Sequence, residues 1–488
     1  MSSYPSSPQQ PTFSLLSRSF AFCPGARFTG LLEPAFWEAL AQQHHVHFGA
    51  GAGDTFNAPV TLWAWLSQVL SPRKSCVAAV ARVLVLCASL SRPLCSANSG
   101  AFCKARAKLP VAFLQAATRQ LGQAVEQRAL PGWRWHNRSV KVVDGSIVQL
   151  PDTAENLAVY PQQRSQKPGT SPTCLRLVVV LALATAGLLD AATGPYRGKN
   201  SGEMSLLHSL LGQFQAGDIA LGDRYYGCYL LLAGLPRRGV DGCFRLPVQK
   251  EETFASGIPL GPDDWLQTWD KPRRPEWIAP EAWAELPGQI QVRVLRLHVG
   301  RPGWRTREVY LVTTLTDART YPAADLGALY RARWNAELDL RALKQTLGLK
   351  MLTCQTPALI EAELWVHLLG YNLTRCVMAQ AAWQAGVCPR QLSFAAAVQT
   401  LDAFRWLLGC SDQDRAVLGA AVAVALASQR VGQRPDRYEP REIKHRQRKY
   451  PELKKSRQHR RHELREPGSP PGARPGRKGA GQNRPSGR

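Results

Sequence analysis

The chain has 488 residues and a mass of 53.8 kDa, a length that predicts two or three domains instead of one core. Hydrophobic residues make up 45% of it, enough apolar surface to exclude a wholly disordered protein. Its 61 Lys and Arg outnumber its 36 Asp and Glu and leave a net charge of +25, which favours a polyanionic partner, with nucleic acid as the first candidate.

The first residues lack any export pattern. Residues 1–11 are rich in Ser, Pro and Gln without the basic and then apolar order of a secretory signal, so we expect a flexible N-terminus over 1–30 and a cytoplasmic location. The longest apolar runs, 177–189 and 416–427, are shorter than the roughly 18 to 20 residues that span a bilayer, so no membrane segment is predicted. The 12 Cys include no CxxC pair and are interpreted as reduced core residues.

Residues 31–135 are predicted to form a mostly helical region. Helical periodicity covers 31–70, 76–90 and 111–127. Basic residues occur along this region, and a solvated surface explains them as well as a DNA contact does. The segment 43–47 contains three His, but no carboxylate or Cys stands at zinc-finger spacing, so we interpret it as a polar loop or helix face.

Strands and helices alternate after residue 139. Three short β-branched or apolar runs predict a β-meander, at 140–143, 177–184 and 188–192. A helix, a short buried strand and a second helix are expected next, at 203–214, 218–221 and 226–235. This alternation predicts an α/β core, which we assign to residues 136–246 and 318–356.

The remaining chain divides into an insertion, a helical region and a tail. Strands at 292–299 and 309–315 lie between core elements, so a β-rich insertion is expected over 247–317. Long helices follow at 323–347, 357–384, 392–407 and 415–428, and those after 356 form a helical C-terminal region, 357–430. Residues 431–488 are predicted to be a disordered basic tail, since positions 434–488 alone supply 12 of the 25 net charges.

One side of the predicted helix 323–347 carries reactive groups. At about 100° per residue a stripe roughly 60° wide holds Tyr330, Arg333, Glu337 and Lys344. Arg341 falls near the same edge of the helix. The stripe places one carboxylate among cations. An amphipathic helix with an i, i+4 ion pair between Arg333 and Glu337 explains the same residues and stays open as an alternative.

Two further acids follow short apolar strands. Asp144 in VDGS and Asp223 in GDRYY are each expected where a strand ends and opens to solvent. The alternative for Asp144 is an Asp-Gly turn, whereas the residues after Asp223 look helical. Asp152 is interpreted as a turn or cap residue. Glu203 is interpreted as a first-turn residue that complements its helix dipole, with an acid that supports the site as the alternative.

Three carboxylates in a cationic protein suit phosphodiester chemistry. Mg²⁺ prefers a few carboxylates together with water and phosphate oxygens. Two such ions about 3.5 to 4 Å apart activate the attacking oxygen and stabilise the leaving oxygen. The cations beside Glu337 are then placed to hold the phosphate backbone.

These residues resemble the DDE transposases of bacterial insertion sequences, and in particular the insertion-sequence-four group. The hallmark of that group, a Y-(2)-R-(3)-E-(6)-K spacing, is matched without a gap by Tyr330, Arg333, Glu337 and Lys344. Asp144 matches the group's first acid and Asp223 its second, at intervals of 79 and 114 residues that suit the group. The resemblance covers about residues 140–356.

The resemblance implies a ribonuclease-H-like catalytic core, interrupted by the β-rich insertion and flanked by helical N-terminal and C-terminal regions. Asp144, Asp223 and Glu337 are then the catalytic residues and hold two Mg²⁺ ions, which Mn²⁺ is able to replace. The implied DNA-binding residues lie around them: Tyr330, Arg333, Lys344, Arg341 and, by a looser match, Arg245.

The implied activity is metal-dependent DNA strand cleavage followed by strand transfer, with cut-and-paste excision of an insertion sequence. Its expected partners are double-stranded DNA, as terminal inverted repeats and as target, and a second copy of the chain in the end-paired complex. Residues 31–135 are expected to bind the repeats. The protein is expected to act at the bacterial nucleoid. The group also flips a base onto an aromatic side chain; packing is the favoured role for the Trp residues of the insertion, Trp265, Trp269, Trp277, Trp283 and Trp304.

Alternatives from other classes remain. A metal-dependent nuclease of the same fold cuts without joining, and a catalytically inactive DNA-binding protein derived from a transposase does neither, although the intact acids argue against the second. A two-carboxylate enzyme acting on sugars explains the acids but not the basic face around Glu337. The chain has no GxxxxGK[ST] loop and no GxSxG elbow, which disfavours ATP-dependent and acyl-transfer chemistry.

Overall fold

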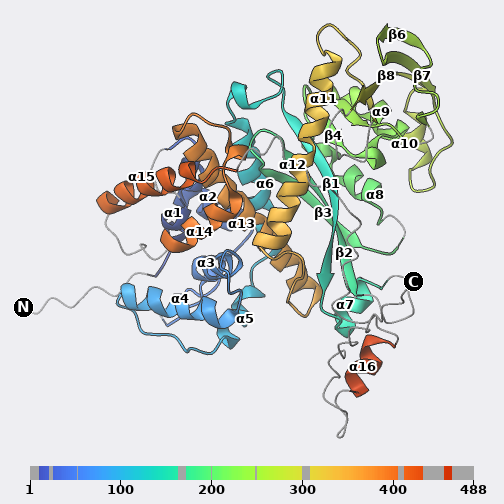
Figure 1. The fold of residues 1–488 in the computed structure, drawn as a ribbon. Helices are drawn as coiled ribbons and strands as arrows, with labels where there is room; N and C mark the ends of the chain where they lie inside the picture. Colours follow the sequence, from blue (N-terminus) through green and yellow to red (C-terminus); the bar gives the residue numbers. More distant parts are fainter. Residues whose placement is uncertain are drawn as a thin grey trace, which may run out of the picture.

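A mixed sheet runs through the middle of the molecule (Figure 1). The computed structural model describes residues 10–20, 26–51, 53–162, 172–198, 201–247, 250–298, 308–404, 412–431 and 455–463. In these ranges nine strands pair in the order β3-β2-β1-β4-β5-β9-β8-β7-β6. Their bounds are β1 Val140–Leu150, β2 Thr173–Ala182, β3 Leu188–Pro195, β4 Ile219–Gly222, β5 Asp241–Arg245, β6 Ile258–Gly261, β7 Asp264–Asp270, β8 Gln289–His298 and β9 Glu308–Thr313.

The first five strands confirm the predicted α/β core. β1, β2 and β3 form an antiparallel meander, and β4 and β5 then add in parallel on the other side of β1. The crossover from β3 to β4 contains α8 (Glu203–Leu210), and the one from β4 to β5 contains α9 (Tyr229–Gly234). This order, 3-2-1-4-5 with one meander and two parallel additions, is the ribonuclease-H-like arrangement.

Helices cover both faces of this sheet. Along β2 the side chains alternate: Leu177 and Val179 belong to the core shared with the N-terminal and C-terminal helices, whereas Val178 and Val180 belong to the core shared with α8 and α9. A strand that is buried on both faces has apolar residues at every position instead of at alternate positions, which explains why residues 177–182 of β2 are all apolar. The core is therefore a three-layer structure (Figure 1).

The N-terminal helices pack directly onto the core. Their bounds are α1 Ser14–Phe20, α2 Pro34–Gln43, α3 Ala58–Val69, α4 Cys76–Ser89, α5 Gly100–Arg106 and α6 Val111–Gln127. α3 and α6 lie against α13 (Pro357–Gln384), and one hydrophobic core contains residues of all three. A flexible N-terminus is expected over 1–30, but the described part of this range contains α1. This helix buries Leu15, Leu16 and Phe20 in the same hydrophobic core.

One asparagine joins three elements at the centre of this packing. Asn372 of α13 exchanges two hydrogen bonds with the backbone of Leu188 in β3, at 2.7 and 2.8 Å, and donates a third to Thr118 O in α6, at 2.9 Å. At the same junction a Cβ atom on Gly122 of α6 would lie 2.0 Å from Leu188 O. Only glycine therefore allows α6 to approach β3 this closely.

The β-rich insertion extends the core sheet instead of standing apart from it. β9 pairs with β5, and β8, β7 and β6 follow in antiparallel order. The short helix α10 (Pro280–Ala284) lies between β7 and β8. The buried ion pair between Arg293 of β8 and Asp264 of β7, at 2.5 Å, fixes the register of the two strands. The insertion is thus hydrogen-bonded to the core through β5.

The helix expected over 323–347 is interrupted twice. α11 (Ala323–Ala332) and α12 (Trp334–Arg341) are separated by a turn at Arg333, and Ala342–Thr346 form a π-helical turn. A π turn adds a residue to the helical repeat, so positions beyond residue 341 no longer follow 100° per residue. The angle of 100° per residue that places Lys344 on the stripe therefore does not apply to its position.

The C-terminal helices end the described fold. They are α13, which runs over the residues predicted for it, α14 (Phe394–Phe404) and α15 (Asp412–Ser428). Most of the tail predicted over 431–488 lies outside the described residues, and the described part of it contains α16 (Arg457–Glu463). No described helix is both long and apolar enough to cross a membrane.

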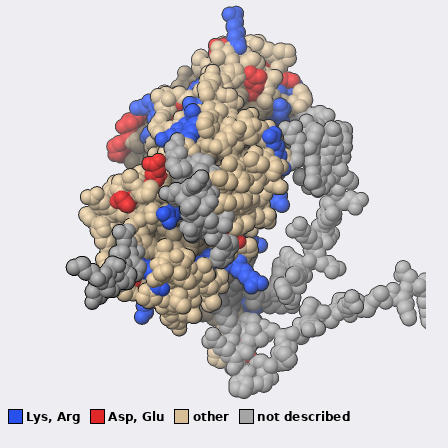
Figure 2. All heavy atoms as spheres, turned by 90° about the vertical axis from the view of Figure 1, so that its left-hand side faces the viewer, with Lys and Arg blue, Asp and Glu red and all other residues tan. Residues whose placement is uncertain are grey.

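The face of the N-terminal and C-terminal helices carries scattered charges. Figure 2 shows Lys and Arg there as separate spots among uncharged side chains, in the described part of that face. α4 and α15 also expose valines, including Val77 and Val424. The net positive charge of the chain is therefore not gathered into one patch on the described surface of this view.

Candidate active site

Asp144 and Asp223 lie side by side at one end of a parallel strand pair. β1 and β4 pair in parallel as far as Val142 and Leu221, and each acid stands two residues further on. Asp223 follows the end of β4, as the sequence predicts. Asp144 lies inside the 11-residue strand β1 and pairs with Val179 of β2, so both the expected strand end and the alternative Asp-Gly turn are wrong there. β1 continues because its later residues maintain the ladder with β2.

The environment of Asp144 disfavours its charged form. Burial raises the pKa of Asp144 to about 6, and the charges of Asp223 and Glu337 act in the same direction. A hydrogen bond from the Gly145 N–H and the charge of Arg333 oppose this shift. The three carboxylates are thus close enough to repel one another, and a bound cation would relieve that repulsion.

Glu337 reaches the two aspartates from α12, which packs beside β1 (Figure 1). Arg333 Nη2 lies 3.1 Å from Glu337 Oε1, and the Arg333 side chain is 15% exposed while that of Glu337 is 41% exposed. The i, i+4 ion pair of the amphipathic alternative is therefore present. Both side chains also act on Asp144, which a purely solvated helix face does not explain.

A buried acid that the sequence reasoning missed anchors α12. Asp339 is 1% exposed and pairs with Arg375 of α13, at 2.7 Å, and with Arg390, at 3.0 Å. It lies two positions after Glu337, so it points away from the aspartates and into the helical layer. The pattern of the sequence gives no signal for this role, because its partners lie 36 and 51 positions away.

Tyr330 and two arginines lie together beside Asp223. Burial raises the pKa of Tyr330, which lies within electrostatic range of Arg333, Arg245 and Asp223. The Arg333 guanidinium lies 5.7 Å from the centre of the Tyr330 ring. Among the described residues the Nε atoms of Arg245 and Arg333 are buried and have no hydrogen-bond partner. Buried donors without a partner are rare in folded proteins and commonly mark the place of a ligand or water.

The two remaining basic residues differ in position. Lys344 lies in the π turn, half-buried, where burial lowers its pKa and the nearby charge of Asp144 opposes that shift. Arg341 is exposed, and its Nε donates to Gln345 Oε1 at 3.0 Å on the same helical segment. Arg341 makes no hydrogen bond or ion pair with the three acids in the described structure. The arrangement therefore brings Lys344, and not Arg341, to the acids.

An exposed tryptophan stands next to the site. Trp334 follows Arg333 on α12 and is 54% exposed. In the insertion, Trp269 and Trp283 are 5% and 8% exposed, which agrees with the packing role predicted for them, and Trp304 lies outside the described residues. In the sequence, the signal that points to Trp334 is its position directly after Arg333.

The donor chemistry of the three acids fits a divalent cation. Gly145 N donates to Asp144 Oδ1 at 2.9 Å and Tyr225 N to Asp223 Oδ1 at 2.8 Å, which leaves Oδ2 of each carboxylate without a hydrogen bond from the described residues. Over the described ranges no three His, Cys, Asp or Glu side chains form a ready-made metal site. The acids therefore offer oxygen donors without a closed cage, as in sites where Mg²⁺ keeps water and phosphate ligands.

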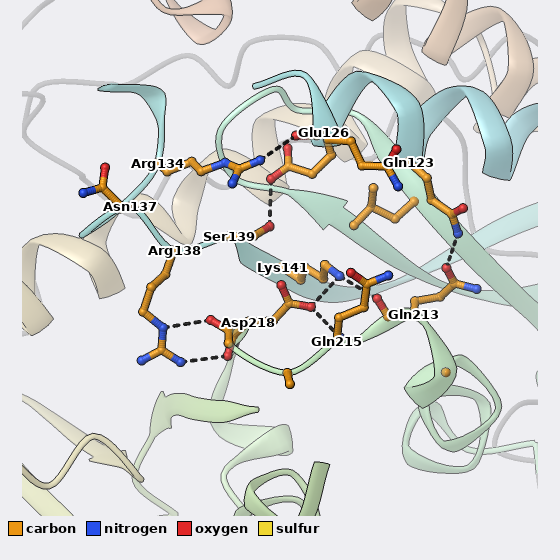
Figure 3. A pocket seen from close by; sticks show the side chains of 15 residues that line it. Gln123, Glu126, Arg134, Asn137, Arg138, Ser139, Lys141, Gln213, Gln215 and Asp218 are labelled. Carbon is orange, nitrogen blue, oxygen red and sulfur yellow. Dashed lines mark hydrogen bonds and ion pairs between the residues drawn. The ribbon is translucent and has the colours of Figure 1, made fainter. Parts of the chain in front are cut away.

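A polar cavity of about 570 Å³ lies at the opposite end of β1 and β4 from the acids (Figure 3). Its charged groups are already paired: Lys141 Nζ lies 2.5 Å from Asp218 Oδ2, and Arg138 Nη2 lies 2.6 Å from Asp241 Oδ2. The carboxylate of Glu126 accepts from two hydroxyl groups. Arg134 also lines the cavity, where it donates to Glu126 O and its buried Nε has no hydrogen-bond partner among the described residues. The cavity is separate from the candidate active site.

Comparison with known proteins agrees with this geometry. Residues 135–373 match a family model described as a transposase DDE domain. The transposase InsG of insertion sequence element IS4 from Escherichia coli (strain K12) is 31% identical over 300 residues, which are 59% of this chain and 65% of that protein. The putative transposase InsZ of the same strain is 31% identical over 117 residues, 24% of this chain and 38% of InsZ. The chain thus matches less than two thirds of the length of each relative.

A solved structure is also similar. The cryo-EM structure of a piggyBac transposase synaptic complex with hairpin DNA aligns over 87% of this chain and 87% of its own, with a TM-score of 0.43 and 11% sequence identity.

Proposed function

Residues 135–373 belong to the family of transposase DDE domains, and from this membership we propose that the chain is an insertion-sequence transposase, which cleaves DNA strands and joins the freed ends to a target. One observation carries the proposal: Asp223 and Glu337, from two other elements, lie within electrostatic range of Asp144 in β1, and so do Arg333 and Lys344. A set of acids bordered by cations serves phosphodiester chemistry, because the cations hold the phosphate whose displacement the acids support.

We assign the three acids to a divalent metal site. The family uses divalent ions, and we propose two Mg²⁺ ions, replaceable by Mn²⁺, held by Asp144, Asp223 and Glu337. When bound, such ions activate the attacking oxygen and stabilise the leaving oxygen. The chain itself fixes the donors, because β1 and β4 hold the two aspartates in register and the Asp339 ion pairs hold α12.

The basic and aromatic residues are assigned to DNA. Arg333 and Arg245 each present a buried Nε donor, and Lys344 stands beside Asp144, so these cations are placed to bind phosphate oxygens near the cleaved bond. Tyr330 packs under the Arg333 guanidinium and orients it. Trp334 offers an exposed ring on which a base can stack. Arg341 is exposed and is assigned at most a long-range electrostatic contribution.

Two steps give the proposed reaction. Water attacks a phosphodiester bond at the end of the element, which leaves a 3′-hydroxyl group. That hydroxyl then attacks a phosphodiester bond of the target and displaces a new 3′-oxygen, so the number of phosphodiester bonds is conserved in the second step. We further propose cut-and-paste excision, recognition of the terminal inverted repeats by residues 31–135, pairing of two copies across the two ends, and action in the cytoplasm at the nucleoid.

The test uses the purified full chain, Mg²⁺ and a linear DNA that carries both ends of the element flanking its gene. We expect 3′-hydroxyl ends that become covalently joined to a second DNA, read by sequencing every product. Asp144→Asn, Asp223→Asn and Glu337→Gln should each remove cleavage while DNA binding remains. Cleavage without joined products would identify the nuclease alternative, and binding without cleavage the inactive alternative.

A matched pair of arginines tests the DNA contacts. Arg333→Ala should lower the cleavage rate at least about 100-fold, because it removes a charge held at the reacting phosphate. Arg341→Ala, on the same helical segment but directed to Gln345, should change the rate less than about threefold. Equal loss in the two variants would show that the stripe acts only through its net charge.

A further inference from the structure

Glu203 comes close to the active site from the face of the sheet opposite to α12. It is the first residue of α8, whose N-terminus follows Gly202, and α8 packs on β2 and β3. Asp144 shares its side of β1 with Val142, in the core that α12 covers, whereas Gly145 shares the other side with Val143, in the core that α8 covers. The two helices therefore approach the same stretch of β1 from opposite faces.

The Glu203 carboxylate rests on the backbone directly after Asp144. A Cβ atom on Gly145 would lie 2.5 Å from Glu203 Cδ and 2.6 and 2.8 Å from its two carboxylate oxygens. Any side chain at position 145 would thus displace the carboxylate. The glycine of the VDGS segment is explained by this contact, since it lies in a strand and not in a turn.

Charged and polar groups surround Glu203 in this place. Arg176 of β2 lies within electrostatic range of its carboxylate, and the guanidinium of Arg176 stacks at 4.9 Å on the ring of Tyr196. Tyr226 lies near the same carboxylate and in range of Asp144 and Asp223, and its buried hydroxyl has no hydrogen-bond partner among the described residues. Asp223 acts electrostatically on Glu203 itself. Glu203 therefore lies between the strand that carries Asp144 and the turn that carries Asp223.

An acid that only complements a helix dipole is commonly solvated in the first turn. Glu155 of α7 (Ala154–Val159) is of that kind, because it occupies a first turn and is exposed. Glu203 instead directs its carboxylate at β1 and is half-buried among groups that belong to the candidate active site. The two glutamates provide a matched comparison within one chain.

We propose that Glu203 is a fourth carboxylate of the active site, a positioning residue that fixes the Asp144–Gly145 segment of β1 and adds its negative charge beside Asp223. The charge of Arg176 lies in electrostatic range of it. The inference rests on the proposed function, since it concerns the cation site assigned to the three acids. Residues that orient and support metal ligands typically contribute on the order of 10-fold to 100-fold in metal affinity.

Binding of Mn²⁺ to the full chain without DNA, measured by titration calorimetry, tests the proposal without relying on activity. Glu203→Gln keeps the size of the side chain and removes its charge, and we expect roughly tenfold weaker Mn²⁺ binding. Glu155→Gln should bind Mn²⁺ like the unsubstituted chain, and Asp144→Asn should bind far more weakly. Circular dichroism and the melting temperature verify that each variant is folded.

The outcomes separate this inference from the proposed function. Unchanged Mn²⁺ affinity in Glu203→Gln together with a loss in Asp144→Asn overturns the role of Glu203 alone. No Mn²⁺ binding by the unsubstituted chain, or unchanged binding by Asp144→Asn, overturns the proposed metal site and the inference with it. A raised Mn²⁺ concentration should return cleavage by Glu203→Gln to the unsubstituted plateau, whereas a merely structural residue would lower that plateau.

A second variant tests the contact itself. Gly145→Ala places a methyl group where the Glu203 carboxylate lies, so it should weaken Mn²⁺ binding as Glu203→Gln does. In a Glu203→Ala background the space is free, and Gly145→Ala should then add little further loss. Additive losses in the double variant would show that Gly145 and Glu203 act independently and would overturn the proposed contact.

Discussion

Asp144 has an electrostatic cost that the rest of the fold has to offset. Its carboxylate is mostly buried among other acids, and burial raises its pKa to about 6. In the unfolded chain this group titrates near the ordinary value for Asp, so between about pH 4 and pH 6 the folded state binds more protons than the unfolded state. Folding therefore loses stability as the pH rises through that window, and the full cost is present above about pH 6.

Removal of this charge should stabilise the metal-free protein while it removes cleavage. For Asp144→Asn in EDTA near pH 7 we expect the free energy of unfolding to rise by about 1 to 3 kcal/mol, from denaturant titration. The gain should disappear below about pH 3, where both states are protonated. Asp325→Asn is the control, since Asp325 is 43% exposed and pairs with His136 at the surface. A destabilised Asp144→Asn variant at neutral pH would contradict this account.

At the scale of single elements, the α11–α12 segment shows what sequence patterns contain and what they omit. The spacing from Tyr330 to Glu337 covers little more than two turns, so a helical wheel brings these residues to one side correctly. Lys344 also comes near Asp144, but through a π turn that depends on packing in the helical layer and not on local propensity. The roles of Asp339 and Glu203 depend on partners distant in sequence, which no local pattern reveals.

The position of α12 should depend on Asp339. Asp339→Ala leaves Arg375 and Arg390 without their buried partner, so we expect the free energy of unfolding to fall by about 3 to 5 kcal/mol. The comparison is Asp402→Ala, which removes a partly exposed pair with Arg82 at 3.7 Å and should cost at most about 1 kcal/mol. Chemical denaturation of both variants provides the measurement. Similar small losses in the two would mean that hydrophobic packing alone holds α12.

At the scale of the whole molecule, the regions that the sequence predicts as separate segments are joined by shared packing and strand pairing. Composition and periodicity predict the regions 31–135 and 247–317, and short apolar runs predict four of the five core strands without their order. Their attachment could not be predicted, because it depends on single contacts: Asn372 joins α6, β3 and α13, and β5 pairs with β9 to continue the sheet. Contacts between residues hundreds of positions apart leave no periodic trace in a sequence.

A chain without residues 1–130 should not fold. Such a variant lacks α3 and α6, which share a hydrophobic core with α13, so it exposes the apolar surface that they cover. We expect aggregation on expression and no cooperative melting, whereas the full chain should show one calorimetric transition for the N-terminal helices and the core together. A soluble truncated chain that melts cooperatively would show that the N-terminal helices form an independent domain.

The place of α13 also governs how this protein matures on the ribosome. The helices made first cannot complete their core until Pro357–Gln384 has been synthesised and has left the exit tunnel. At about 5 to 20 residues per second the finished N-terminal helices, which end at Gln127, wait roughly 13 to 50 s for that partner. A polypeptide released before residue 384 therefore lacks the helix that completes the core of its N-terminal helices.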